Sequence, residues 1–246
     1  MPELTWLAWA LLGVAAAIVG LSKTAVPGAG TVAVAIFAAV LPARQSTGTI
    51  LLLLIVADVF AVLAYRRHAN WAALLRLAPA VVVGIVLGVL FLAVADDAWV
   101  KRVIAVILLS VIALTLLRRR MSRSVADAGS HRIAAATYGT LGGFTTMVAN
   151  AAGPVMSMYF LAARFSVKEF LGTAAWFFAL VNLSKLPFSI GLGLITVPGL
   201  LLDLALVPLV VGGALFGRWV ADRIDQVLFE RLVIVFTIVG AVYLLL

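Results

Sequence analysis

The sequence Gly-Leu-Ser-Lys-Thr-Ala-Val-Pro-Gly-Ala-Gly at residues 20–30 separates an apolar run at 4–22 from a second apolar run at 27–41. A membrane-spanning helix needs about 20 apolar residues, and the second run falls short of that length. A shortened apolar segment beside Pro and Gly is typical of a helix that is interrupted within the membrane or re-enters it. We therefore expect a broken or re-entrant helix here.

The same pattern occurs again at Asn150-Ala151-Ala152-Gly153-Pro154, where the next apolar run is also short. Apolar runs make up most of the chain. Their approximate bounds are 4–22, 27–41, 47–65, 77–95, 103–117, 133–149, 154–163, 170–190, 204–217 and 232–246. This series predicts an all-α, polytopic integral membrane protein.

The composition supports this interpretation. Hydrophobic residues make up 65% of the 246 residues and charged residues 11%, whereas a soluble domain carries about 45–50% apolar and about 25% charged residues. These values exclude a soluble enzyme, a disordered chain and a nucleic-acid-binding module. The chain has no cysteine, its two histidines form no metal set, and no HExxH, GxSxG or P-loop pattern occurs. We expect no metal, no cofactor and no catalytic residue.

The two halves of the chain resemble each other. Matching residues are separated by 124 positions early in each half and by 129 positions later; they are Gly48 with Gly172, Thr49 with Thr173, Asp58 with Asn182, Pro79 with Pro208, and Gly84 with Gly213. We predict two repeats of about five membrane segments each, at 1–117 and 133–246, joined by a linker at 118–132.

Basic residues predict the orientation in the membrane, because short cytoplasmic loops collect Lys and Arg. The linker at 118–132 is rich in arginine, so we place it in the cytoplasm. Most other basic loop residues then also lie inside, and the loop at 191–203, which has no basic residue, lies outside. We therefore expect inverted repeats and both termini outside. We also expect the first apolar run to be retained as a membrane segment, because no basic region precedes it.

Three charged residues lie away from the predicted loops: Lys23, Asp58 and Lys185. A charge at the centre of a membrane helix costs at least about 2.5–3.5 kcal/mol, so such residues are usually functional. Structural alternatives exist for each. Asp58 could pair with a lysine, Lys185 could extend to the membrane surface near Pro187, and Lys23 could be interfacial.

The first break combines Lys23 and Thr24 with Gly28 and Gly30. A helix that starts after Pro27 presents unpaired N–H groups and the positive end of its dipole, and glycine lets a ligand approach the backbone. An ammonium group, a hydroxyl group and free N–H groups are the components of a site for a small anion.

The second break contributes Thr145, Thr146, Asn150 and Gly153, and Lys185 could supply its charge. Either break alone could equally be a tight hairpin between two helices. Their matched positions in inverted halves favour a transport site instead.

Asp58 and its repeat partner Asn182 differ in that only Asp58 can titrate. We include Asn182 among the substrate-binding residues. Our hypothesis is that Asp58 couples the movement of the anion to protons.

Several stretches resemble the TauE/SafE sulfite exporter family: residues 20–28, Ser46-Thr47-Gly48 followed by Asp58, residues 65–71, 145–154 and 168–173, and the pattern Asn182-x2-Lys185-x-Pro187. The resemblance covers nearly the whole chain. It implies a multi-pass transporter of the bacterial cytoplasmic membrane for a small sulfur-containing anion, such as sulfite or an organosulfonate like sulfoacetate, and it does not specify which.

Together these observations predict a secondary transporter that exports a small anion by alternating access. An anion channel, an intramembrane enzyme acting on a lipid phosphate, and a structural membrane subunit are the alternatives. The expected partners are the anionic substrate and membrane lipid, with a possible homodimer and no nucleic acid.

Overall fold

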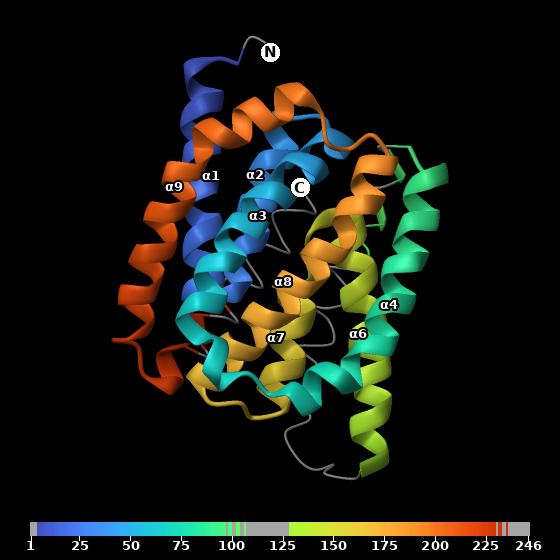
Figure 1. Cartoon of the computed structure of the whole chain (residues 1–246), viewed down its shortest axis with the longest axis vertical. Helices are drawn as coiled ribbons and strands as arrows, with labels where there is room; N and C mark the ends of the chain where they lie inside the picture. Colours follow the sequence, from blue (N-terminus) through green and yellow to red (C-terminus); the bar gives the residue numbers. More distant parts are fainter. Residues whose placement is uncertain are drawn as a thin grey trace.

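The computed structural model of the chain describes residues 4–96 and 128–229, together with 98–99, 102–103, 106, 231–232 and 235. These residues are largely helical and include no strand (Figure 1). The elements are α1 (Trp6–Thr24), η1 (Pro27–Ala29), α2 (Gly30–Val40), α3 (Ala43–Tyr65), η2 (Arg66–His68), α4 (Trp71–Val94), α6 (Ala128–Ala149), α7 (Ala152–Ala162), α8 (Val167–Gly191) and α9 (Val197–Ala221). The predicted segments at 103–117 and 232–246 lie almost entirely outside the described residues.

Five of the described helices, α1, α3, α4, α8 and α9, are long and apolar enough to cross a membrane. Two shorter apolar helices follow the two predicted breaks, one over Pro27–Val40 and one over Ala152–Ala162. The prediction of an all-α, multi-pass membrane protein is therefore confirmed. Which side of the membrane the termini face stays a prediction.

Side-chain caps fix where several helices begin. Asn70 accepts a hydrogen bond from the Ala73 amide at the start of α4 (3.0 Å), and Thr196 accepts one from the Gly199 amide at the start of α9 (3.2 Å). The second cap is followed by proline, which favours the first turn of a helix. As a result α9 begins at Val197, within the loop that we expected at 191–203. The described part of α6 begins at Ala128, within the expected linker.

The direction of corresponding helices differs between the halves. In Figure 1, α1 and α3 run downward, whereas α6 and α8, their counterparts in the second half, run upward. In the same way α4 runs upward and α9 downward. Opposite directions are what inverted repeats require, so the arrangement agrees with that prediction, although the repeat itself stays a prediction.

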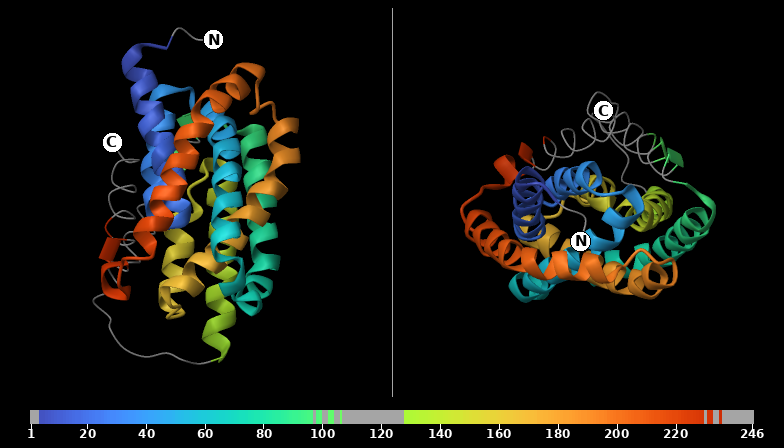
Figure 2. Two further views of the ribbon diagram at one scale, coloured as in Figure 1. Left: turned by 60° about the vertical axis from the view of Figure 1, so that its left-hand side comes forward. Right: turned by 90° about the horizontal axis from the view of Figure 1, so that it is seen from above.

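Each half packs its first helix against the fourth helix of the other half. The view from above in Figure 2 places α1 beside α9 at one end of the molecule and α4 beside α6 at the other. Glycines make both contacts close: a Cβ at Gly20 would overlap the Val210 carbonyl oxygen, and a Cβ at Gly143 would overlap the Val81 carbonyl oxygen. Small residues permit this kind of packing in membranes.

A second pair of contacts relates α3 to α8. Gly48, near the start of α3, packs against the backbone of Leu194 in the α8–α9 connection. Gly172, near the start of α8, packs against the backbone between Tyr65 and Ala69 in the α3–α4 connection, where an added Cβ would lie 2.8 Å from the Tyr65 carbonyl oxygen. The two glycines are matched in the predicted repeat, and their surroundings are matched as well.

Candidate functional site

The two helix breaks meet inside the bundle. After α1 ends at Thr24, Ala25 (φ −130°, ψ −52°) and Val26 (φ −136°, ψ 84°) leave the helical conformation, and Pro27 begins η1. After α6 ends, Asn150 adopts a left-handed backbone conformation with φ 53°, which Asn tolerates better than most residues. A Cβ at Gly153 would lie 2.9 Å from the Pro27 carbonyl oxygen, so the second break packs directly on the first.

The breaks leave the starts of two helices without a side-chain cap. The residues before η1 and α7, Val26 and Ala151, make no side-chain hydrogen bond to the first turn of the helix that follows. The first N–H groups of a helix have no partner within the helix, and they carry the positive end of the helix dipole. Both features favour an anion at this point.

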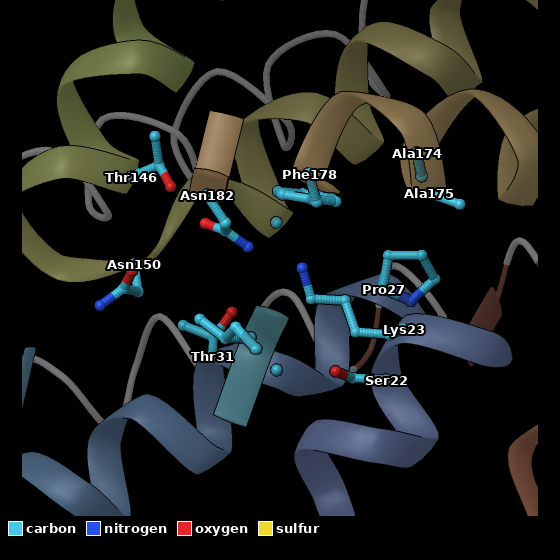
Figure 3. A pocket seen from close by; sticks show the side chains of 13 residues that line it. Ser22, Lys23, Pro27, Thr31, Thr146, Asn150, Ala174, Ala175, Phe178 and Asn182 are labelled. Atoms are coloured by element: carbon cyan, nitrogen blue, oxygen red, sulfur yellow. The ribbon is translucent and has the colours of Figure 1, made fainter. Parts of the chain in front are cut away.

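A small cavity of about 20 Å³ lies between the breaks (Figure 3). Six residues from the predicted site line it: Lys23, Gly30, Thr146, Asn150, Gly153 and Asn182. The other lining residues are Ser22, Pro27, Thr31, Leu54, Ala174, Ala175 and Phe178. The cavity is therefore bounded by both breaks and by α3 and α8.

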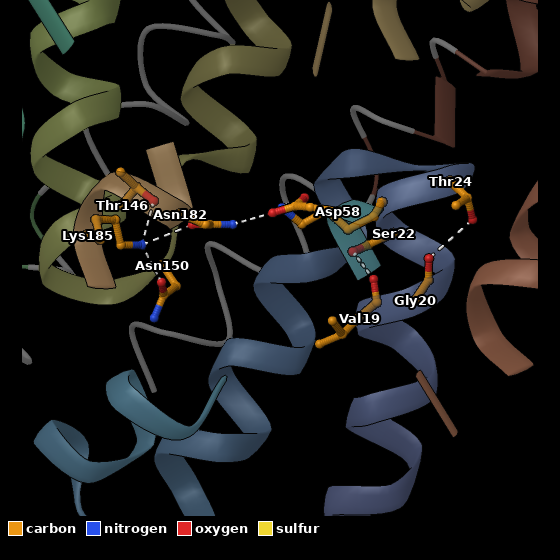
Figure 4. A network of polar contacts seen from close by, with 10 residues as sticks. Val19, Gly20, Ser22, Thr24, Asp58, Thr146, Asn150, Asn182 and Lys185 are labelled. Atoms are coloured by element: carbon orange, nitrogen blue, oxygen red, sulfur yellow. Dashed lines mark hydrogen bonds and ion pairs between the residues drawn. The ribbon is translucent and has the colours of Figure 1, made fainter. Parts of the chain in front are cut away.

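A continuous chain of polar contacts joins the buried charges (Figure 4). The Lys23 ammonium lies 2.7 Å from Oδ1 of Asp58, and Oδ2 of Asp58 accepts a hydrogen bond of 2.6 Å from the Asn182 amide. Oδ1 of Asn182 in turn accepts a bond of 3.2 Å from the Lys185 ammonium. The Asn182 amide thus has its nitrogen toward the carboxylate and its oxygen toward the cation.

Lys185 is inside the protein, with 1% of its surface exposed, and does not extend to the membrane surface. Its ammonium also donates to the Thr146 hydroxyl (3.0 Å) and to Oδ1 of Asn150 (2.5 Å). Within the described residues it has only neutral acceptors and no carboxylate in direct contact. An ammonium buried without a contacting anion is costly, and Lys185, unlike Lys23, has no such anion in direct contact among the described residues.

Five predicted site residues do not line the cavity. Asp58 and Lys185 belong to the chain of polar contacts described above, and the other three are Thr24, Thr145 and Gly28. The Thr24 hydroxyl donates to the carbonyl oxygens of Gly20 (3.1 Å) and Ala214 (2.9 Å), and so ties α1 to α9. The Thr145 hydroxyl donates to the carbonyl oxygens of the preceding turn of α6. The carbonyl oxygen of Gly28 accepts a bond of 3.1 Å from the Thr31 hydroxyl. These residues shape the breaks from behind the cavity.

Sequence reasoning did not select Ser22, Thr31 or Phe178. The Phe178 ring lies under the Lys23 ammonium, with 4.0 Å between the nitrogen and the ring centroid, a cation–π contact. A signal was available, because Phe178 lies four residues before Asn182 on α8 and therefore on the same face of that helix. Ser22 and Thr31 flank the first break, where a hydroxyl can reach the break from the adjoining turn.

The second break is also tied to the first half. The Asn150 amide donates a bond of 2.9 Å to the Thr47 carbonyl oxygen at the start of α3. The Tyr65 hydroxyl, at the end of α3, donates a bond of 2.8 Å to the Thr24 carbonyl oxygen.

Among the described residues no three His, Asp or Glu side chains come together as a metal site would require. The arrangement is suited to holding an anion through an ammonium group, amides and backbone N–H groups.

A sequence model of the family described as sulfite exporter TauE/SafE matches residues 11–244, nearly the whole chain. No curated protein and no solved structure matches the chain. The family comprises transporters and not enzymes, which removes the intramembrane lipid enzyme from the alternatives. With its membrane-spanning helices and its full-length match, the chain belongs to the TauE/SafE family of membrane sulfite and anion exporters.

Proposed function

We propose that this chain carries sulfite, or a similarly small sulfur oxyanion, across the membrane through the cavity between the two breaks. The observation that carries this proposal is the excess of buried positive charge. Lys23 and Lys185 are both buried, and Asp58 is the buried carboxylate that contacts Lys23 directly. One bound monoanion balances the difference and lowers the cost of keeping these charges in the membrane.

The donors around the cavity match an oxyanion. Sulfite and sulfonate groups present several acceptor oxygens, and charge-assisted hydrogen bonds to such oxygens are the strong ones. Lys23, beside the first break, supplies a charged side-chain donor, and the uncapped start of α7, at the second break, supplies backbone N–H groups beside Gly153. Donors from both breaks can therefore contact one anion at the same time.

The size of the cavity favours a compact solute. A volume of about 20 Å³ holds one or two water-sized groups, so even sulfite requires the lining side chains to move. An organosulfonate such as sulfoacetate adds a carbon chain and a carboxylate, and it requires a larger rearrangement. We therefore rank sulfite above organosulfonates as the substrate.

Asp58 competes with the anion for Lys23. While Asp58 is ionised, it holds the Lys23 ammonium at 2.7 Å. A proton on Asp58 removes this competition and also removes the repulsion between the carboxylate and an incoming anion. Proton binding at Asp58 and anion binding at Lys23 therefore favour each other, and anion affinity rises as pH falls.

Alternating access requires that the cavity open to one side at a time. The matched contacts of Gly48 with Leu194 and of Gly172 with Tyr65 lie at opposite ends of the α3–α8 pair. We propose that these contacts close the two ends in turn, while the α1–α9 and α4–α6 pairs, held by close glycine contacts, move as units.

The test is sulfite transport by the purified chain in lipid vesicles, with Lys23→Ala as the variant. Lys168→Ala is the matched control, because Lys168 is an exposed lysine on α8. We expect sulfite flux in the wild type and in Lys168→Ala, and loss of flux in Lys23→Ala when all three chains are folded. Equal flux in Lys23→Ala would rule out the proposed site, and the absence of sulfite flux in the wild type would rule out the substrate.

A further inference from the structure

Asp203 is a buried carboxylate that the proposed transport site does not use. It lies in the second turn of α9, where we expected the end of a loop, and 5% of its surface is exposed. Leu202, Leu206 and Val210 are buried on the same helix, while Leu201 and Leu204 are exposed. Asp203 therefore lies on the inward face of α9, which packs against α1 and α3.

Neither carboxylate oxygen of Asp203 has a hydrogen-bond partner among the described residues. Transferring an ionised carboxylate into such surroundings is far more costly than transferring the neutral acid. Asp58, by contrast, is equally buried but contacts both Lys23 and Asn182. The structure thus contains one buried carboxylate with partners and one without.

The charged groups on the helices that pack against Asp203 do not neutralise it. On α1 and α3 the charges within the membrane are Lys23 and Asp58, which are paired with each other. Gly199 on α9 faces Thr49 on α3, and both helices run in the same direction (Figures 1 and 2). Arg44 precedes this contact and Asp203 follows it, which separates their backbones by about 13 Å along the helices.

On its own helix, Asp203 is also far from a cation. The basic residue of α9 is Arg218 in the last turn, which is 15 residues away and so about 22 Å along the axis. No described group near Asp203 stabilises its ionised form.

We propose that Asp203 is a proton-binding site of the transporter, protonated while α9 is packed as seen here and deprotonated when the α1–α9 pair shifts against α3 during the cycle. The step is the reversible addition of one proton to one carboxylate oxygen, with no other reactant. The inference rests on the proposed transport function for its role in a cycle. The site itself depends only on the burial and isolation of Asp203.

The contact with α1 supplies the link to transport. The α1–α9 interface is formed by glycine and backbone, with Gly213 against the Ala17 carbonyl oxygen and the Thr24 hydroxyl on the Ala214 carbonyl oxygen. The helix that carries Lys23 is therefore in direct contact with the helix that carries Asp203. A movement of α1 that follows anion binding carries α9 with it and so changes the packing of α9, and of Asp203, against α3.

The first test labels the purified full-length chain with dicyclohexylcarbodiimide, which reacts with a protonated carboxylic acid in an apolar environment and not with an ionised one. Mass spectrometry locates the label. We expect label at Asp203, several-fold more at acidic than at alkaline pH, and none in Asp203→Asn. Asp222, an exposed carboxylate at the end of the same helix, is the internal control and should stay unlabelled. Absence of label at Asp203 at every pH would overturn the proposal.

The second test measures protons and sulfite together in vesicles that contain a pH-sensitive dye. We expect Asp203→Asn to bind sulfite with wild-type affinity but to move fewer protons per sulfite, and Asp203→Glu to restore the wild-type ratio. An unchanged ratio in a folded Asp203→Asn chain would overturn the role in the cycle. A wild type that labels at Asp203 but moves no sulfite would contradict the proposed function and leave the proton site standing.

Discussion

The two helix breaks lie at matched places in the halves but differ in backbone conformation and in electrostatics. The first break has Lys23 paired with Asp58, so its cation is largely neutralised. The second break has Lys185 bound to Thr146, Asn150 and Asn182, all of which are neutral. The comparison teaches that each half interrupts a helix at the cavity, while the charges are divided unequally between the two interruptions.

This difference predicts unequal effects on stability when each lysine is removed. Lys23→Met leaves the Asp58 carboxylate buried without its cation, and breaking a buried ion pair in this way costs about 3–5 kcal/mol. Lys185→Met leaves neutral amide and hydroxyl acceptors unpaired, at about 1–3 kcal/mol for each. It also removes a buried ammonium that has no carboxylate in direct contact, and the removal of that unfavourable charge offsets much of the loss. Thermal unfolding in detergent should give the lower melting temperature for Lys23→Met. A lower melting temperature for Lys185→Met would contradict the unequal division of charge.

The two helix interfaces between the halves, unlike the two lysines, should be equally sensitive to substitution. Gly213→Ala on α9 and Gly84→Ala on α4 each force a methyl group onto the backbone of the helix opposite, and overpacking of this kind costs about 1–3 kcal/mol. Gly212→Ala is the matched control, because a Cβ there meets nothing within 4 Å. We expect a similar loss of melting temperature in the first two variants and no loss in the control. A loss in only one half would show that the two interfaces are not equivalent.

The pH dependence of anion binding should depend on Asp58 alone among the three charges of the site. In the wild type a proton on Asp58 frees Lys23, so sulfite affinity should rise about tenfold as pH falls, which corresponds to about 1.4 kcal/mol. In Asp58→Asn the competitor is always neutral, and the affinity should be high at every pH. Isothermal titration at acidic and neutral pH measures this, with sulfate as a second anion whose own charge does not change in that range. An equally steep pH dependence in Asp58→Asn would remove Asp58 from the coupling.

The smallest expected effect comes from comparing two threonines, one beside each break. Thr146→Val removes a neighbour of Lys185 that lines the cavity, and we expect sulfite affinity to fall about threefold to tenfold, in line with the net value of one hydrogen bond. Thr24→Val removes hydrogen bonds to the Gly20 and Ala214 carbonyl oxygens, neither of which lines the cavity, so it should lower the melting temperature slightly and leave the affinity unchanged. A larger loss of affinity in Thr24→Val than in Thr146→Val would contradict their placement.

Much of the fold could be predicted from the sequence because long apolar runs have few structural solutions in a membrane. The boundaries were harder, since capping decides them locally: Thr196 and Pro198 start α9 seven residues before the apolar run that we expected at 204–217. That shift turned Asp203 from a loop residue into a buried one. The pattern of apolar residues could not have predicted the burial of Asp203, because that burial depends on packing against other helices.

The residues that meet at the cavity or in its polar network were predictable where a break or an intramembrane charge identified them, as for Lys23, Asn150 and Lys185; their role in binding stays a prediction. The direction in which a side chain points from its helix could not be predicted from the sequence. Thr24 follows Lys23 directly, yet it faces α9 and not the cavity, whereas Thr31 and Phe178 reach the cavity from neighbouring turns. Adjacent residues on a helix point in directions about 100° apart, so proximity in sequence to a break does not decide membership of the site.

The most direct test of the central claim is the stoichiometry of sulfite binding to the purified chain and to the variant in which Lys23 and Lys185 are both replaced by methionine. The account predicts one sulfite bound per wild-type chain and none bound to a folded double variant, with Lys168 and the loop arginines unchanged in both. One sulfite bound to the double variant with unchanged affinity would contradict the account, because the positive charge that holds the anion would then lie elsewhere.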